Sequence, residues 1–412
     1  MNQSNRRDIR RSTGWFAASA LVVAGIAMGA GTPIEARADT PIRIGFINPV
    51  TGAFGSLGKS ARQGMELALA NAAADPELKE IRLVVEERDS AAKTADAIRY
   101  ARELVQRENI DVLMGGLSSA ECLSLQKLAP EVRIAYLPTS GCWVDDFDAP
   151  ANVNPYSFRV TASNRQRNRA FADWLVKNAG RNWYVVYSDY AYGQSGLKAF
   201  QEAMSAAGGT VSGSIGIPFG STDLASYISK IDRSADGLYF VLAGRDAILA
   251  LQEVTSQGLA GKMKLAGMQS LIVAENFPRI PASVEDLVFI GSYPRDATGA
   301  LDTPANGAFR KTWEQKYPGQ PVGLNAFETY QATNVLLTAI KRSGFKGRAD
   351  TDKLIKELAG MQVDAGQAFP AGPITMRASD HQGVAPLYIA TVKDGKEQVI
   401  HAISPEQIDR IR

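Results

Sequence analysis

The sequence LMGGLSSAEC, residues 113–122, decides how the chain is expected to fold. It continues an apolar run from Ile110, which predicts a buried strand, and its two glycines then allow a tight turn. Two serines stand where an amphipathic helix begins, with Cys122 and Leu125 on its apolar side. The first turn of a helix has unpaired N–H groups and a partial positive charge, so this turn is a suitable seat for a carboxylate.

The same alternation of apolar runs and amphipathic segments continues in both directions along the chain. It predicts parallel sheets with right-handed crossovers, and therefore an α/β fold. The expected strands are 42–47, 81–87, 110–114, 133–137, 183–188, 210–217, 238–243, 265–267 and 287–290. The expected helices include 60–74, 94–107, 165–178, 195–207, 224–232, 304–317, 325–343 and 351–359. Residues 386–393 and 396–402 predict a hairpin around Asp394-Gly395.

The first 38 residues have the features of an export signal. Arginines cluster before an uncharged apolar segment at about 15–30, and Ala36-Arg37-Ala38 is a small-x-small cleavage pattern. We therefore expect cleavage after Ala38 and a mature chain in the periplasm. A membrane anchor is the alternative, because the apolar segment approaches the length of a span. Arg6-Arg7 leaves open whether export follows the twin-arginine or the general secretory route.

The basic balance of the chain comes from this segment. Residues 1–38 hold five arginines and two acidic residues, a net charge of +3, whereas the whole chain is +2. Subtracting +3 from +2 leaves −1 for the mature part. We therefore expect no binding of nucleic acid or of an anionic membrane surface. The length of 412 residues is sufficient for two domains.

The two cysteines, Cys122 and Cys142, are a candidate disulfide. Both follow the ends of neighbouring predicted strands, and an even number of cysteines in an exported chain favours pairing. Two buried free thiols are the alternative, because sequence alone does not show the geometry that a bridge needs.

No arrangement typical of catalysis or of a metal centre is found in the sequence. Gly58-Lys59-Ser60 follows a predicted strand, but a phosphate-binding loop needs a glycine five positions before Gly58, where Ala53 stands. The two histidines, His381 and His401, both lie near the C-terminus, so a catalytic triad or a histidine-rich metal site is difficult to build. We expect a protein that is not an enzyme and uses no cofactor or metal; a nucleotide hydrolase remains an alternative.

Short polar side chains do gather where predicted strands end. Ligands of open parallel sheets bind at the carboxyl ends of the strands, so these positions are expected to share one cleft. They are Ser118, Ser119, Thr139, Ser140, the segment 189–193, Arg245, Asp246 and Gln269. Turn and cap chemistry alone explains any one of them equally well. Trp143 is a candidate wall of the cleft, or a packed loop aromatic.

These motifs resemble the type I periplasmic solute-binding proteins of ABC transporters, in the leucine/isoleucine/valine-binding (branched-chain amino acid) family. The resemblance covers nearly the whole mature chain. It includes IRIGF at 42–46, GGLSS at 115–119, DYAYGQ at 189–194, TYQA at 329–332 and AGPI at 371–374.

The resemblance implies two α/β lobes joined by three crossovers, with a ligand between lobes that close on it. The first lobe would comprise 39–158 plus 292–380, and the second 159–291 plus 381–404. It also implies a monomer that delivers a small molecule to an ABC permease in the inner membrane. A sensory receptor that uses the same fold with a signalling partner is the alternative.

The resemblance also implies which residues hold the ligand. Ser119, with the loop Thr139-Ser140-Gly141, would bind a carboxylate; Ser140 replaces the hydroxyl of the family threonine, whose position is Gly141. The tyrosine of the second lobe is Tyr192, and an aromatic residue of the first loop corresponds to Leu57.

One position departs from the family pattern. The acidic residue that binds the ammonium of branched-chain amino acids corresponds to Gln269, and an amide does not neutralise a buried cation. Either Asp246 takes that role or the ligand has no ammonium, in which case Arg245 can meet an acidic or hydroxylated end. A branched-chain or related amino acid, a small organic acid, an aromatic acid and an amide all remain open.

Overall fold

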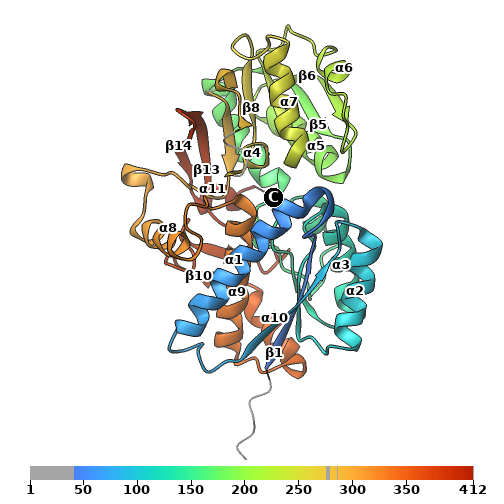
Figure 1. Ribbon diagram of the computed structural model, residues 1–412, viewed down its shortest axis with the longest axis vertical. Helices are drawn as coiled ribbons and strands as arrows, with labels where there is room; N and C mark the ends of the chain where they lie inside the picture. The colour runs from blue at the N-terminus through green and yellow to red at the C-terminus, as the bar shows by residue number, and fades with distance from the viewer. Residues whose placement is uncertain (1–40, 275–278, 285, 412) are drawn as a thin grey trace, which may run out of the picture. The chain divides into compact units, whose positions relative to one another are not determined.

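The computed structural model describes residues 41–274, 279–284 and 286–411. The predicted export signal lies outside these residues. The described chain is an α/β fold in which two large, mainly parallel sheets are each flanked by helices (Figure 1). This confirms the fold class expected from the alternation of strands and helices.

The first sheet has four parallel strands in the order β2-β1-β3-β4. They are β1 (Ile42–Asn48), β2 (Leu83–Asp89), β3 (Val112–Gly115) and β4 (Ala135–Leu137). The helices of this lobe are α1 (Gly55–Ala74), α2 (Thr94–Gln106), α3 (Ser119–Glu131), α9 (Leu324–Ser343) and α10 (Thr351–Leu358). Ile44 and Met114 are fully buried, as expected for strands with helices on both faces. Although α9 is distant in sequence, it packs along α1 (Figure 1).

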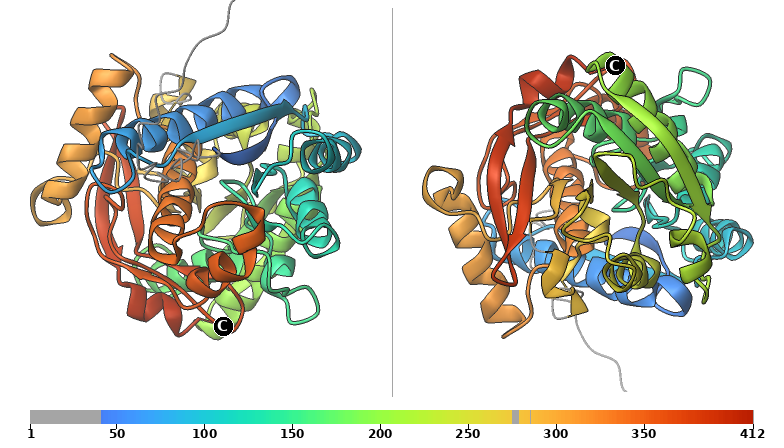
Figure 2. Two further views of the ribbon diagram at one scale, coloured as in Figure 1. Left: turned by 90° about the horizontal axis from the view of Figure 1, so that it is seen from below. Right: turned by 90° about the horizontal axis from the view of Figure 1, so that it is seen from above.

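The second sheet has seven strands in the order β14-β13-β9-β8-β7-β5-β6. Its parallel strands are β5 (Asn182–Ser188), β6 (Thr210–Ile217), β7 (Gly237–Val241), β8 (Lys264–Met268) and β9 (Val288–Gly291). The predicted hairpin, β13 (Leu387–Lys393) and β14 (Lys396–Ile403), extends it antiparallel at one edge (Figure 2, right, red). The helices of this lobe are α4 (Asn164–Asn178), α5 (Ala191–Ala206), α6 (Ala225–Ile228) and α7 (Gly244–Ser256).

Several elements differ from the sequence-based expectation. Helix α1 begins at Gly55 rather than at 60, and α5 begins at Ala191 rather than at 195, which places Tyr192 in its first turn. Helix α6 is a single short turn of the expected 224–232. The pattern also missed α11 (Pro405–Asp409) and a small antiparallel sheet of β10 (Gln362–Val363), β11 (Ile374–Met376) and β12 (Gly383–Val384). Helix α8 (Pro304–Lys316) was expected.

The chain passes between the two lobes after β4, after β9 and again before β13. The first and third passages lie side by side, because Arg159 and Gln382 form a parallel bridge. The predicted lobe boundaries at 158 and 291 fall between the two sheets, whereas 381–404 includes β12, which pairs with β11. These boundaries stay a prediction.

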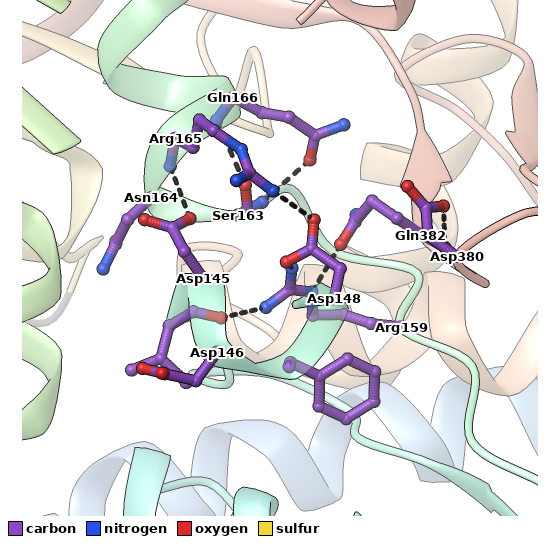
Figure 3. Close-up of polar contacts among 12 residues, drawn as sticks. Asp145, Asp146, Asp148, Arg159, Ser163, Asn164, Arg165, Gln166, Asp380 and Gln382 are labelled. Atoms are coloured by element: carbon purple, nitrogen blue, oxygen red, sulfur yellow. Dashed lines mark hydrogen bonds and ion pairs between the residues drawn. The ribbon is translucent and has the colours of Figure 1, made fainter. Parts of the chain in front are cut away.

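A fully buried arginine holds the first passage together (Figure 3). The Arg159 guanidinium donates to Asp148 Oδ1 at 2.8 Å and to Gln382 Oε1 at 2.5 Å. It also donates to the carbonyls of Cys142 and Val144. Burial lowers the pKa of Arg159, and the neighbouring Asp148 carboxylate opposes that shift.

Candidate functional site

The turn after β3 places the first helix end of the site. Gly115 has a φ of 107°, and a Cβ there would lie 2.0 Å from the Ile47 carbonyl, so only glycine fits. Ser118 is the N-cap of α3: its Oγ accepts from Glu121 N–H at 3.3 Å, and its own N–H donates to Glu121 Oε2. The Ser118 hydroxyl therefore serves the helix. Ser119 is 1% exposed, and its Oγ has no hydrogen-bond partner.

The loop after β4 lies against the same helix end. Gly141 has a φ of 70°, and a Cβ there would lie 2.2 Å from the Leu117 carbonyl. The next residue, Cys142, forms a disulfide with Cys122 of α3, which joins this loop covalently to the helix that carries Ser119.

A narrow cavity opens in front of Ser119. Its volume is only ≈ 30 Å³. Its walls combine residues of both lobes and are mostly apolar and aromatic. They are Phe54, Leu57, Leu117, Ser118, Ser119, Gly141, Trp143, Tyr190, Tyr192, Ala243, Gly244, Ser270, Val273, Leu324 and Asn325. None of these described residues carries a charged side chain.

Five helices begin at this cavity. Residues at the N-terminal ends of α1, α3, α5, α7 and α9 line it, and of these helices only α3 has a side-chain cap. Each helix end contributes a partial positive charge and unpaired N–H donors. Without acidic side chains in the described lining, the cavity favours an anionic group and disfavours a cation.

The aromatic wall is continuous across the two lobes. The rings of Trp143 and Tyr192 are 5.5 Å apart, and those of Tyr192 and Tyr190 are 5.9 Å apart. The ring of Phe219 in the second lobe lies 5.4 Å from the ring of Tyr190 and 5.1 Å from the ring of Phe54 in the first lobe, so it connects the two. A flat apolar ligand would therefore meet rings from both sides.

A buried ion pair holds Trp143 from behind. The indole N–H donates to Glu328 Oε2 at 3.1 Å, and the Arg167 guanidinium lies 4.9 Å from the Trp143 ring. Arg167 and Glu328 form a salt bridge at 2.7 Å, with 1% and 0% of their side chains exposed. Ser292 Oγ also donates to Glu328, at 2.9 Å. Because Glu328 is already bound, it is not available to a ligand.

The structure brings some of the predicted site residues together. Leu57, Ser118, Ser119, Gly141 and Tyr192 line the cavity. Their contact with a ligand stays a prediction.

The other predicted residues lie outside the lining. Thr139 and Ser140 are buried, and Ser140 Oγ accepts from Asn325 Nδ2 at 2.5 Å. Asp246 accepts from Gly220 N–H at 2.8 Å, and Arg245 follows the lining residue Gly244. Gln269 is turned away: its Oε1 accepts from Ser292 N–H, and its Nε2 donates to the Tyr293 carbonyl.

Sequence reasoning did not name several lining residues, among them Phe54, Ser270 and Asn325. Tyr190, by contrast, stands within the predicted segment 189–193 and lines the cavity, and Ser270 directly follows the predicted Gln269. No local sequence pattern indicated Asn325, because α9 does not follow a predicted strand.

Within the part of the chain that the structure describes, no cluster of three or more His, Cys, Asp or Glu residues could hold a metal ion. Among those same residues, none of the helices combines the length and the apolar character that a membrane span requires. Helix α1 already begins at Gly55, so the residues directly before Gly58-Lys59-Ser60 are helical and do not form a phosphate-binding loop.

Comparison with known proteins agrees with this architecture. The profile of a family described as periplasmic binding protein matches residues 41–397. The chain belongs to the periplasmic binding protein family. A curated relative, Leu/Ile/Val-binding protein homolog 8 of Brucella melitensis biotype 1, is 22% identical over 383 residues, covering 90% of this chain and 93% of the relative. The predicted membership in the leucine/isoleucine/valine-binding branch is thereby confirmed.

Solved structures of this periplasmic family have the same fold. An ABC transporter solute binding protein from R. palustris, in complex with benzoate, superposes with a TM-score of 0.79 at 23% identity, covering 89% of this chain and 97% of that one. A leucine binding protein from Thermotoga maritima has a TM-score of 0.76 at 19% identity, covering 89% and 99%. Both a benzoate complex and a leucine binding protein are thus similar to this chain in fold.

Proposed function

We propose that this protein is the periplasmic ligand-capture component of an ABC importer, and that its ligand is a small aromatic carboxylate without an ammonium group. The observation that carries the proposal is the unpartnered, buried hydroxyl of Ser119 at the start of α3, inside a cavity with aromatic walls. A buried hydroxyl without a partner costs free energy that a ligand oxygen would recover.

The charges around the cavity favour a ligand without an ammonium group. A buried cation needs a carboxylate partner, and no acidic residue is among the described residues of the lining. Asp246 and Glu328 are held by Gly220 and Arg167, and Gln269 is turned toward Ser292. By contrast, the helix ends suit an anion.

The walls of the cavity favour an aromatic ligand. Trp143, Tyr190, Tyr192 and Phe54 form the apolar faces of a narrow slot, a shape that a flat ring matches. The slot is so narrow that its walls must separate to admit a ring, which fits lobes that open and close by a hinge. The benzoate complex of the R. palustris protein supports the same ligand class.

We further propose that the mature chain begins at Asp39 and acts as a monomer that presents its ligand to a permease. The family match begins at residue 41, immediately after the predicted cleavage site, which supports that start.

Isothermal titration calorimetry tests the ligand class. The mature protein is titrated with benzoate, phenylacetate, leucine and isobutyrate. We expect benzoate or phenylacetate to bind and leucine to bind more weakly. Tighter binding of leucine would contradict the proposal, because it would require an ammonium site that the cavity lacks.

A pair of serine variants tests whether the Ser119 hydroxyl binds the ligand carboxylate. Ser119→Ala should weaken binding of the preferred carboxylate by about 1–3 kcal/mol, because one desolvated hydrogen bond is lost. Ser157→Ala is the matched control: Ser157 Oγ is also buried without a partner, but Ser157 does not line the cavity. Equal affinities of the wild type and Ser119→Ala would show that the Ser119 hydroxyl does not bind the carboxylate.

A further inference from the structure

The second-lobe wall of the cavity contains a chain of three hydrogen-bonding groups. Tyr192 Oη lies 2.7 Å from Ser270 Oγ, and Ser270 Oγ lies 2.9 Å from the Leu242 carbonyl oxygen. Both Tyr192 and Ser270 line the cavity, and both are 3% exposed. The distances show that the groups are bonded, and the chemistry of each group fixes where the protons lie.

A carbonyl oxygen only accepts, so in the bond to Leu242 the serine hydroxyl must be the donor. A hydroxyl has one proton, and that of Ser270 is thereby used. In its bond to Ser270, Tyr192 must therefore donate.

The remaining candidate acceptor near the tyrosine proton does not alter this result. Met268 Sδ lies 3.8 Å from Tyr192 Oη and is also part of the protein wall. Whether the proton points at Ser270 or at Met268, it is directed into the protein. Burial raises the pKa of Tyr192 to about 12, so the hydroxyl keeps its proton at neutral pH. What Tyr192 presents to a ligand is then a lone pair.

We propose that Tyr192, oriented by Ser270 and Leu242, selects ligands that carry a neutral hydrogen-bond donor. The inference rests on the proposed function and adds a second recognition element to it: an aromatic carboxylate with a hydroxyl group on the ring. A ligand with a second carboxylate, or with a carbonyl, would place an acceptor against the Tyr192 lone pair. An ammonium would be a donor too, but the described residues of the lining offer no charge to balance it.

The test compares hydroxyl with fluorine, which has nearly the same size and no proton. Calorimetry is performed on the mature protein with benzoate, the three hydroxybenzoate isomers and the three fluorobenzoate isomers. We expect one hydroxybenzoate to bind about tenfold more tightly than the fluorobenzoate with the same substitution pattern. Equal affinity within all three pairs overturns the inference while leaving the proposed function intact. If none of the acids binds, the proposed function fails and this inference fails with it.

Two variants and one control then show which residue causes the preference for hydroxyl over fluorine. In Tyr192→Phe the hydroxyl-to-fluorine affinity ratio should fall close to one. In Ser270→Ala the tyrosine proton loses its nearest acceptor and is free to turn toward the ligand, so the ratio should also fall. Tyr187→Phe removes a tyrosine hydroxyl of β5 outside the lining, and the ratio should not change. A ratio that survives in Tyr192→Phe would show that another group reads the hydroxyl, which contradicts the inference.

Discussion

Two buried arginines, Arg159 and Arg167, both help to position Trp143. Arg159 acts on the backbone beside it, and Arg167 acts on its ring. Arg159 donates to the carbonyls of Cys142 and Val144, the residues on either side of Trp143, and so fixes the backbone. Arg167 and its partner Glu328 contact the indole itself. One cluster therefore shapes the passage between the lobes, whereas the other positions a wall of the cavity.

The two clusters also differ in how far apart in sequence their partners lie. The carboxylate that faces Arg159 is Asp148, eleven residues away in the same passage. The carboxylate that faces Arg167 of the second lobe is Glu328 in α9 of the first lobe. A buried ion pair is weak evidence for stability, but breaking one leaves an uncompensated charge. We therefore expect the first cluster to control mainly folding, and the second to control both folding and binding.

The largest effect is expected for Arg159→Met. The substitution approximately keeps the volume of the side chain. Among the described residues, it leaves Asp148 with the partly exposed Arg165 as its one arginine partner, and two carbonyls lose their donor. The free energy of unfolding should fall by about 3–5 kcal/mol. Urea denaturation followed by circular dichroism measures it. A loss below about 1 kcal/mol would mean that water or Arg165 replaces the guanidinium.

A smaller loss of stability, but a clear effect on binding, is expected for Glu328→Gln. The amide still accepts from the indole N–H, yet Arg167 loses the carboxylate with which it pairs among the described residues. We expect a loss of about 2–4 kcal/mol in unfolding free energy, together with weaker ligand binding. The Trp143 indole N–H resonance, assigned with Trp143→Phe, should shift. An unchanged affinity would show that the indole position does not depend on this pair.

The fold could be predicted from sequence wherever the periodic pattern was long. Strand β6 was expected at its observed bounds, and β1 within one residue, because each is a run of seven or eight residues between turn signals. Helix α1 was expected to begin too late, because its first turns contain Gly55 and Gly58, residues of low helix propensity that tertiary contacts overrule. The strands of the third sheet have only two or three residues, too few for a period to be seen.

Site residues could be predicted from the sequence only where they directly follow a predicted parallel strand. Ser119 and Tyr192 lie at the cavity, because the residue after a parallel strand reaches the same edge of the sheet wherever the sequence places it. Gln269 also follows a strand, but its side chain forms hydrogen bonds with the backbone of Ser292 and Tyr293. No local sequence pattern predicts that orientation. Asn325 reaches the cavity from α9, whose packing along α1 is a long-range contact.

A third buried carboxylate, Glu397, lies farther from its arginine than Asp148 and Glu328 do, and it is expected to respond to pH. Its nearest arginine contact, to Arg295 Nη2, is 3.7 Å, against 2.8 Å and 2.7 Å for Asp148 and Glu328. Burial raises the pKa of Glu397 from 4.5 to about 7. Because the folded pKa is the higher one, the stabilisation is complete below pH 4.5 and is lost as the pH rises through 7. The loss amounts to about 3 kcal/mol.

Glu397→Gln should therefore flatten the dependence of the melting temperature on pH between about 4.5 and 7 and stabilise the protein at and above the upper end of that range. Glu80→Gln, at an exposed glutamate, is the control and should leave the profile unchanged. A profile of Glu397→Gln parallel to that of the wild type would mean that Glu397 is ionised throughout.

The smallest effect is expected for Arg165→Gln. Arg165 contacts the same carboxylate as Arg159, at the same distance of 2.8 Å, but 34% of its side chain is exposed. Solvent screens such a pair, and Arg159 still balances Asp148, so the loss should stay below about 1 kcal/mol and diminish further at about 1 M salt. The backbone N–H of Arg165, which donates to Asp145, is unaffected. Urea denaturation at low and high salt measures both quantities. A loss equal to that of Arg159→Met would show that Asp148 needs both arginines together, and then burial would not be what separates their contributions.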